Sequence, residues 1–177
     1  ASGIYCLNSD GELEWNEDPP FNDVVSPPQP LLTASGAVIV CWSSLVSNNT
    51  EQGIYAYDKT TGSLRWSSTE FTYTGDSDPK GYSVYDSPTV TEDGIIIAVA
   101  REHVIIALDE ISGTKQWLWP DDSGEYRSIL AGSYLDGWRG APAIAPDRSV
   151  VAVADWFEDP RLIVLNDFGM ALTDELL

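Results

Sequence analysis

The sequence predicts an all-β fold of repeated four-stranded antiparallel units, and three observations support this prediction. Trp15, Trp66 and Trp117 follow one another at intervals of 51 positions, so a unit of constant length recurs along the chain. Each tryptophan closes a pair of short alternating runs joined by turn residues, which is the pattern of a β-hairpin. No stretch of useful length has the 3.6-residue period of a helix. A fixed period of this size indicates a β-propeller, with one blade per repeat.

The hairpin that ends in tryptophan predicts the last two strands of each blade. Its middle copy, GIYAYDKTTGSLRW, covers residues 53–66 and contains the Asp, Thr and Gly that suit a tight turn with positive φ. The earlier copy is GIYCLNSDGELEW at 3–15, and the later copy is VIIALDEISGTKQW at 104–117.

A second hairpin precedes the first in each unit and predicts the first two strands. It reads QPLLTASGAVIVCW at 29–42, SPTVTEDGIIIAVA at 87–100 and APAIAPDRSVVAVA at 141–154. Each copy begins with a proline, which is tolerated at the start of a strand because no ladder hydrogen bond is lost there. Arg148 stands in the third copy where the other two copies have glycine.

These hairpins predict one partial propeller over residues 1–177, with blade pieces at 1–16, 29–68, 87–119 and 141–177. Leu165, Asn166 and Gly169 keep the turn pattern of the last unit, but Thr173 stands where tryptophan is expected. The count is about three and a half blades, whereas propellers close with 4–8. The additional blades are expected from a longer form of this chain, from a second copy or from another chain.

Composition and charge narrow the function classes. The chain has 28 Asp and Glu against nine Lys and Arg, which gives a formal charge of −19 and argues against a nucleic-acid partner. No apolar run is long enough to span a membrane, and the N-terminus has no signal-peptide pattern. We therefore expect either that a signal has been removed or that Ala1 is not the natural start.

Three residues give information on the cellular compartment in which the protein is located. Cys6 and Cys41 lie in apolar strand patterns and are expected to be buried as small hydrophobes, although a disulfide between them stays open. Asn48 begins an Asn-Asn-Thr sequence, which is a glycosylation acceptor pattern in secreted eukaryotic proteins. We expect an extracytoplasmic location, whether periplasmic, luminal or secreted.

The last hairpin resembles the tryptophan-docking motif of PQQ-like (quinoprotein-type) β-propeller repeats, Ala-x-Asp-x-x-Thr-Gly-x-x-x-Trp. Kelch repeats have a similar period, but their double glycine is not found in this sequence. The residues that carry the resemblance are Ala56, Asp58, Thr61, Gly62 and Trp66 in one copy, Ala107, Asp109, Ser112, Gly113 and Trp117 in the next, and Cys6, Asn8, Gly11 and Trp15 in the first.

The resemblance implies that each tryptophan ring packs between neighbouring blades against the Ala and Gly positions. A large flat side chain fills such a gap well, and its N–H finds a carbonyl there. These motif residues are therefore expected to be structural. The family also favours a site outside the cytoplasm.

The long connections between strands form the candidate binding face. They cover residues 17–28, 43–52, 69–86, 120–140 and 155–161, and in a propeller they emerge on one face. Loops on a rigid scaffold often carry function, and aromatic rings beside carboxylates suit a sugar, a cationic ligand or a peptide. The candidate residues of this face are Tyr82, Tyr85, Asp86, Tyr134, Asp136, Trp138, Arg139 and Trp156.

Catalysis has little support in the sequence. His103 is the only histidine, and HExxH, P-loop, GxGxxG and paired CxxC motifs are not found. The resemblance raises PQQ with calcium as a possible cofactor pair, but the vicinal cysteines of that site are missing. Clustered acids, namely Asp76, Asp78, Asp121 and Asp122, are weak candidates for calcium ligands.

The interpretation that accounts for most of these observations is a non-catalytic binding or assembly scaffold that binds a protein partner or ligand on the long-loop face. Two alternatives stay open. One is a fragment of a PQQ-dependent dehydrogenase, and the other is a structural subunit of an extracellular assembly.

Overall fold

The structure is a computed structural model that describes residues 3–20, 29–43, 52–69, 87–100, 104–119, 141–154, 161–166, 169 and 171–176. All regular elements in this part of the chain are strands. None of the described segments forms a helix with the length and apolar character needed to cross a membrane.

Four sheets contain all of these strands, and we call them blades 1–4 in chain order. Blade 1 is two-stranded, and blades 2, 3 and 4 are four-stranded meanders in which each strand pairs antiparallel with the next. Blade 1 contains β1 (Ile4–Leu7) and β2 (Leu13–Glu17). Blade 2 contains β3 (Leu31–Leu32), β4 (Ala37–Ser43), β5 (Gln52–Asp58) and β6 (Leu64–Ser68). Blade 3 contains β7 (Thr89–Val90), β8 (Ile95–Ala100), β9 (Val104–Asp109) and β10 (Lys115–Trp119). Blade 4 contains β11 (Ala143–Ile144), β12 (Val150–Ala154), β13 (Arg161–Leu165) and β14 (Ala171–Leu176).

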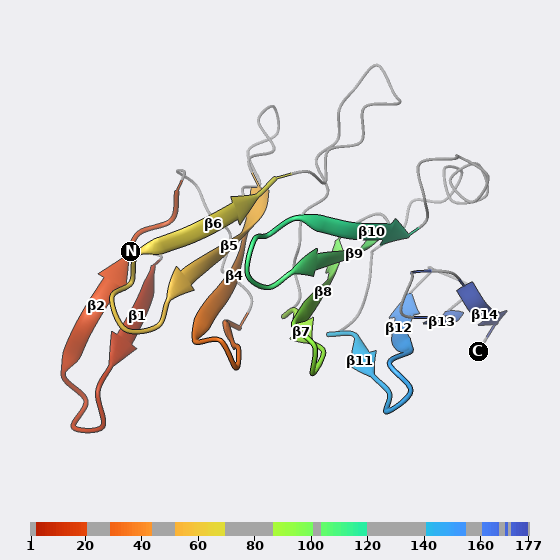
Figure 1. The fold of residues 1–177 in the computed structure, drawn as a ribbon, viewed down its shortest axis with the longest axis horizontal. Coiled ribbons are helices and arrows are strands. Elements are labelled where there is room, and N and C mark those ends of the chain that lie inside the picture. The colour runs from red at the N-terminus through yellow and green to blue at the C-terminus, as the bar shows by residue number, and fades with distance from the viewer. Residues whose placement is uncertain are drawn as a thin grey trace, which may run out of the picture.

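The blades lie side by side in sequence order, from blade 1 at one end to blade 4 at the other (Figure 1). This arrangement confirms the predicted fold class, a partial β-propeller of four-stranded antiparallel blades. The first strands β3, β7 and β11 are only two residues long, and β7 and β11 approach each other across neighbouring blades.

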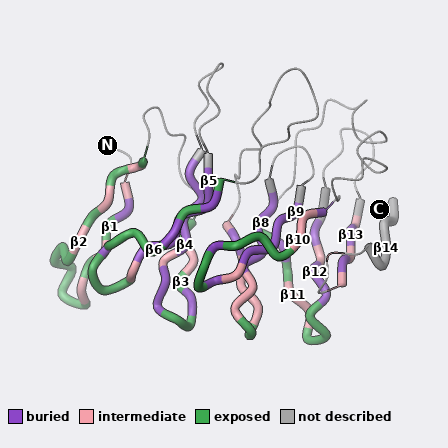
Figure 2. Tube along the Cα trace, turned by 45° about the horizontal axis from the view of Figure 1, so that its top comes forward, coloured by how far each residue is buried: buried purple, intermediate pink, exposed green. Residues whose placement is uncertain are grey.

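The hydrophobic core lies between blades, because successive residues of a strand face opposite sides of its sheet. In β4, Ile39 and Cys41 belong to the cluster shared with blade 3, whereas Val40 and Trp42 belong to the cluster shared with blade 1. A third cluster joins blades 3 and 4. Figure 2 shows the result as buried segments in the middle of the strands and exposed segments at the hairpin turns.

The first hairpin of blades 2, 3 and 4 closes with the same turn. Gly36 donates its N–H to the carbonyl of Thr33 at 3.1 Å, and Gly94 and Arg148 make the equivalent bonds to Thr91 and Ala145. All three residues that donate have positive φ, at 78°, 83° and 69° respectively. Arg148, which replaces the glycine of the other two copies, thus adopts the left-handed conformation that favours glycine.

The last hairpin of every blade contains a β-bulge that the sequence did not predict. The register shifts between Cys6 and Leu7, between Ala56 and Tyr57, between Val164 and Leu165, and at the equivalent place in blade 3. One extra residue on the second strand is thereby placed just before the tryptophan position.

The two cysteines have different environments. Cys41 is fully buried, as expected, but Cys6 is only half-buried, although its Sγ lies 4.0 Å from the Lys59 carbonyl of blade 2, because blade 1 has only two described strands. No disulfide joins the two residues, both of which lie in the described part of the chain.

Candidate functional site

The residues predicted for the binding face lie outside the described residues. The same holds for the candidate metal ligands and for the glycosylation candidate. They are Tyr82, Tyr85, Asp86, Tyr134, Asp136, Trp138, Arg139 and Trp156, then Asp76, Asp78, Asp121 and Asp122, and finally Asn48. The structure does describe the strand ends from which the long connections depart, such as the paired ends Ser43 and Gln52, and these lie opposite the hairpin turns.

The described part of the chain contains one repeated constellation, which joins each blade to the next. The ring of Trp15 lies over Gly62, so that a Cβ on this glycine would be 2.9 Å from the ring. Trp66 lies over Gly113 in the same way at 2.5 Å, and Trp117 lies over Gly169 at 2.7 Å. Glycine is required at these three positions on two counts, since the backbone has positive φ and the ring leaves no room for a side chain.

The indole N–H groups also bond across the blade boundary. Trp15 donates to the carbonyl oxygen of Lys59 at 2.9 Å, and Trp66 donates to the carbonyl oxygen of Glu110 at 2.9 Å. Both acceptors directly follow the aspartate of the repeat motif. Trp15 and Trp66 therefore each contribute an apolar face and a donor to one turn of the following blade.

Asp58 and Asp109 organise the turns that receive the tryptophan rings. The Oδ1 atom of Asp58 accepts hydrogen bonds from the backbone N–H groups of Thr60 and Thr61, and its Oδ2 atom accepts one from Arg65 at 2.6 Å. The Arg65 hydrogen bond and then these backbone bonds lower the pKa of Asp58 to about 2. In blade 3, the Ser112 hydroxyl and the turn backbone lower the pKa of Asp109 below its usual value.

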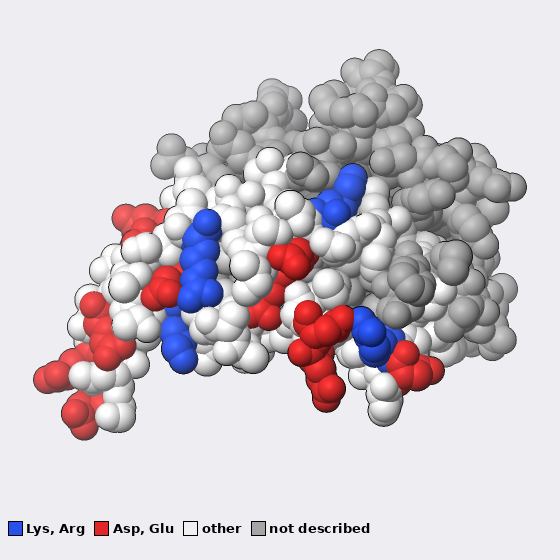
Figure 3. Space-filling model, in the orientation of Figure 1, with Lys and Arg blue, Asp and Glu red and all other residues white. Residues whose placement is uncertain are grey.

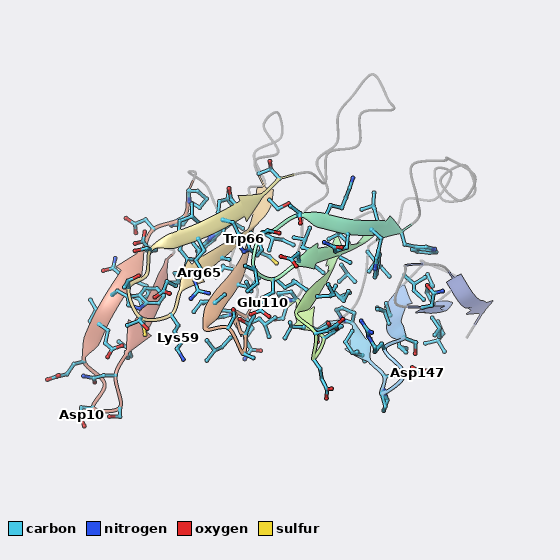
Figure 4. All side chains as sticks on the ribbon, in the orientation of Figure 1. Asp10, Lys59, Arg65, Trp66, Glu110 and Asp147 are labelled. Atoms are coloured by element: carbon cyan, nitrogen blue, oxygen red, sulfur yellow. The ribbon has the colours of Figure 1, made fainter. Side chains whose placement is uncertain are left out.

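Glu110 is the buried carboxylate of this region and connects blade 3 with blade 2 (Figure 4). Its Oε1 atom accepts a hydrogen bond from the backbone N–H of Ser35 at 3.2 Å, and its own N–H donates to the carbonyl of Gly94 at 2.8 Å. Desolvation acts against ionisation of Glu110, but hydrogen bonds from Ser35 and Thr33 outweigh it and lower the pKa of the carboxyl. A buried charge is tolerated where hydrogen bonds satisfy it in this way.

Two ion pairs accompany these contacts on the hairpin-turn side. Arg65 pairs with Asp58 within blade 2, and Arg148 of blade 4 pairs with Asp93 of blade 3. In the space-filling view, acidic side chains stand out along the edge where the hairpin turns lie, with basic side chains beside some of them (Figure 3). The side chains of Arg65 and Asp58 are 31% and 29% exposed and those of Arg148 and Asp93 are 52% and 47% exposed, so both pairs reach solvent and are expected to add little to stability.

The chemistry of this constellation is that of a structural joint. Its carboxylates accept hydrogen bonds from turn backbone, hydroxyl groups or arginine. Among the described residues, no three His, Cys, Asp or Glu side chains gather in a group that could hold a metal ion.

Sequence reasoning missed the roles of Glu110 and Arg65 and the ion pair of Arg148 with Asp93. Glu110 and Ser35 are far apart in the chain, so neither local pattern indicates their contact. The sequence does contain a signal for Arg148. It occupies the turn position that Gly36 and Gly94 hold in the other two hairpins, so its side chain extends from that turn.

Comparison with known proteins adds a family match and several similar structures. The family model described as outer membrane protein assembly factor BamB matches residues 43–156. The crystal structure of BamB from Moraxella catarrhalis is similar at a TM-score of 0.64 and 16% identity, over 98% of this chain and 43% of that one. The quinohemoprotein alcohol dehydrogenase from Comamonas testosteroni is similar at a TM-score of 0.70 and 15% identity, over 98% of this chain and 32% of that one.

A protein of unknown function from Bacteroides caccae has the same fold at a TM-score of 0.58 and 12% identity, and this chain covers 54% of it. The chain thus spans about half or less of the length of these three structures. At identities this low, each likeness concerns the fold. No curated protein matches the sequence.

Proposed function

Because the chain belongs to the PQQ-like β-propeller family described as outer membrane protein assembly factor BamB, we propose that it is a non-catalytic scaffold that binds a protein partner. The observation that carries this proposal is the family match over residues 43–156, which includes the last two strands of blade 2, all of blade 3 and the first two strands of blade 4. In this proposal the motif residues, from Trp15, Trp66 and Trp117 to Gly62 and Gly113, act only by holding blades together.

The carboxylates of the motif turns accept hydrogen bonds within the protein, and this observation supports the proposed scaffold function. Asp58 and Asp109 bind the backbone of their own turns, and Glu110 binds Ser35 of the preceding blade. These carboxylates therefore stiffen the blades. A rigid row of blades suits the presentation of loops to a partner.

The partner surface in this proposal is the long-loop face. Tyr85, Tyr134 and Trp138 supply aromatic contact area, and the acidic residues around them favour a partner with basic groups. The family description refers to outer membrane protein assembly, which favours a site of action outside the cytoplasm.

The dehydrogenase likeness raises PQQ with calcium as a cofactor pair, whose candidate calcium ligands lie outside the described residues. Glu110 is buried with its Oε1 atom bonded to Ser35, and both carboxylate oxygens of Asp58 already accept hydrogen bonds. A titration of the protein with PQQ and calcium tests this directly. We expect no saturable spectral change, and a change that saturates near one equivalent would favour the dehydrogenase alternative.

Site-specific photo-crosslinking tests the binding face. A photoreactive residue is placed at Tyr85 or Tyr134 and, as a control, at Ile111, which is exposed in a hairpin turn. In the cells that make the protein, we expect defined adducts with another protein from positions 85 and 134 and none from position 111. Adducts from position 111 alone would contradict the assignment of the face.

A further inference from the structure

Two Asp-Gly pairs lie in hairpin turns of the described chain, Asp10 with Gly11 in blade 1 and Asp93 with Gly94 in blade 3. Such a pair rearranges without an enzyme when the backbone nitrogen of the glycine reaches the preceding side-chain carboxyl, because glycine has no side chain that hinders the approach. A third pair, at 136–137, lies outside the described residues. The two described pairs allow a comparison within one molecule.

The backbone is nearly the same in the two pairs. Gly11 has a φ of +82° and Gly94 has a φ of +83°. Gly11 donates its N–H to the carbonyl of Asn8 at 3.0 Å, and Gly94 donates its N–H to the carbonyl of Thr91 at 3.1 Å. Both aspartates are exposed. A difference in reactivity between the pairs therefore depends on how each carboxylate is held.

The carboxylate of Asp93 is held at both of its oxygen atoms. Its Oδ1 atom accepts a hydrogen bond from the Thr91 hydroxyl at 2.7 Å, and its Oδ2 atom pairs with Arg148 of blade 4. The Thr91 hydrogen bond and then the Arg148 guanidinium lower the pKa of Asp93. An ionised carboxylate reacts poorly with an amide nitrogen, because only the protonated carboxyl can lose an oxygen as water. The contacts of Asp93 thus work against rearrangement.

The carboxylate of Asp10 has no such contacts. Its backbone N–H donates to the Oδ1 atom of Asn8 at 2.9 Å, but no described residue donates a hydrogen bond to its carboxylate or forms an ion pair with it. Asp10 lies at the tip of the β1–β2 hairpin, remote from the other blades (Figure 4). This exposure does not depend on the place of blade 1 in the row. Thr61, at the equivalent position of blade 2, is also exposed, although the ring of Trp15 covers the residue after it.

We propose that Asp10 is a site of spontaneous isoaspartate formation and that the contacts of Asp93 suppress the same reaction there. The Gly11 nitrogen attacks Cγ of the protonated Asp10 carboxyl. A carbon–nitrogen bond forms, and the carboxyl OH leaves as water with the amide proton. The product is a five-membered succinimide. Water then adds to its main-chain carbonyl carbon, the bond from this carbon to the nitrogen breaks, and the nitrogen regains a proton.

The product has the mass of the starting chain, and the reaction needs no oxidant or reductant. The backbone now passes through the former side-chain carbon, and the α-carboxyl is free. This carboxyl is the group to which isoaspartyl methyltransferases transfer a methyl group from S-adenosylmethionine. The proposal therefore assigns the blade 1 turn to the class of substrates that these enzymes modify.

The change affects a turn that Asn8 closes. The Oδ1 atom of Asn8 accepts hydrogen bonds from the N–H groups of Asp10 and Glu12, and its carbonyl accepts one from Gly11. An isoaspartyl residue adds one carbon to the backbone between these donors. We therefore expect the hydrogen bonds of this turn to be displaced.

Peptide mapping of the aged protein tests the proposal. The folded protein is incubated at neutral pH, and isoaspartate at positions 10, 93 and 136 is measured separately. Chromatography separates the peptides of equal mass, and methyl transfer from S-adenosylmethionine by an isoaspartyl methyltransferase identifies the isoaspartyl form. We expect formation at position 10 to be about fivefold faster than at position 93, the factor that one hydrogen bond of ordinary strength gives. A rate at position 93 that equals or exceeds the rate at position 10 would overturn the proposal.

The unfolded chain is the first control. In urea we expect positions 10 and 93 to react at similar rates, because each aspartate is followed by glycine and neither carboxylate is held. A ratio that stays the same in urea would mean that the folded contacts do not set the rates, and this would overturn the proposal.

Two variants complete the test. Arg148→Gly removes one contact of Asp93 and is expected to raise the rate at position 93 about twofold, with no change at position 10. Asp10→Glu keeps the charge but requires a six-membered ring, which closes slowly, so the signal at position 10 is expected to disappear. No response of position 93 to Arg148→Gly, or a signal at position 10 that persists in Asp10→Glu, would overturn the proposal.

Discussion

At the scale of single residues, the joint between blades depends on glycines that no other residue replaces without cost. Gly113 combines positive φ with a tryptophan ring 2.5 Å from the place of a Cβ. Gly36 has the same backbone conformation, but its nearest neighbour is the flexible end of Lys59. Comparing alanine substitutions at Gly113 and Gly36 therefore separates the free-energy cost of the backbone conformation from the free-energy cost of the ring contact.

We expect Gly113→Ala to destabilise the protein by about 2–4 kcal/mol, since left-handed strain and displacement of a packed ring add together. Gly36→Ala is expected to cost about 1 kcal/mol, because the Lys59 side chain moves aside. Urea denaturation of both variants measures the difference. Equal losses would show that the ring does not lie on Gly113.

At Arg148, the effects of an ion pair and of backbone strain on stability can also be measured separately. Its ion pair with Asp93 and its left-handed backbone act on stability in opposite directions. Arg148→Ala removes the pair but keeps the strain, whereas Arg148→Gly removes both. We expect the glycine variant to be more stable than the alanine variant by about 1 kcal/mol, measured by denaturation. A glycine variant no more stable than the alanine variant would mean that the conformation is not strained.

At the scale of elements, the turn of the last hairpin depends on a carboxylate that is ionised. Asp58 accepts two backbone hydrogen bonds and pairs with Arg65, and its pKa is lowered to about 2. The turn of blade 1 is one residue shorter and has Asn8 at the equivalent position, where its Oδ1 atom accepts hydrogen bonds from the N–H groups of Asp10 and Glu12. An asparagine at this position therefore also accepts hydrogen bonds from the turn backbone.

This comparison yields a prediction on pH. The folded protein holds the Asp58 carboxyl below its usual pKa, so its contribution to stability is complete above about pH 4 and is lost as the pH falls toward 2. Asp58→Asn is expected to flatten the loss of stability between pH 4 and 2, with Asp10→Asn as a control for the removed charge. Denaturant midpoints across this range measure the effect, and parallel curves for wild type and Asp58→Asn would contradict it.

The strands and turns also show which parts of the fold can be predicted from the sequence. Both hairpins of each repeat were predictable, because Asp, Asn and Gly mark their turns and proline or tryptophan marks their ends. The bulges before Trp15 and Trp66 were not predictable, because no particular residue type in the local sequence marks a shift in strand register. The contact of Glu110 with Ser35 depends on how two blades pack and is likewise invisible to a local pattern. The predicted binding face lies in long connections, which have no repeat to align.

At the scale of the whole molecule, the blades form a row whose two ends differ. Among the described residues, no ring lies over Gly11 of blade 1, the equivalent of Gly62 and Gly113, and blade 4 has Thr173 at the position that tryptophan holds in the other blades. Each internal boundary, by contrast, buries a shared apolar cluster. Stability is then a sum over neighbouring blades, as in other repeat proteins.

This asymmetry predicts the mass of the chain in solution. We expect light scattering to give a mass near 19.3 kDa, because two copies joined end to end would lack the tryptophan contact at each new boundary. A mass near twice this value would show that two rows close one ring. The long-loop face would then be a symmetric surface shared by two chains.

The direction of the tryptophan contacts has a consequence for biosynthesis. Each ring docks on a glycine that lies about one repeat later in the sequence, so the ribosome makes the ring first. At translation rates of about 5–20 residues per second, each indole waits for several seconds before its glycine emerges. The nascent chain therefore carries an uncovered aromatic ring at its growing end throughout synthesis of blades 1–3. Blade 4 departs from this order, because Thr173 stands at its tryptophan position and this position adds no indole that must wait for a later turn.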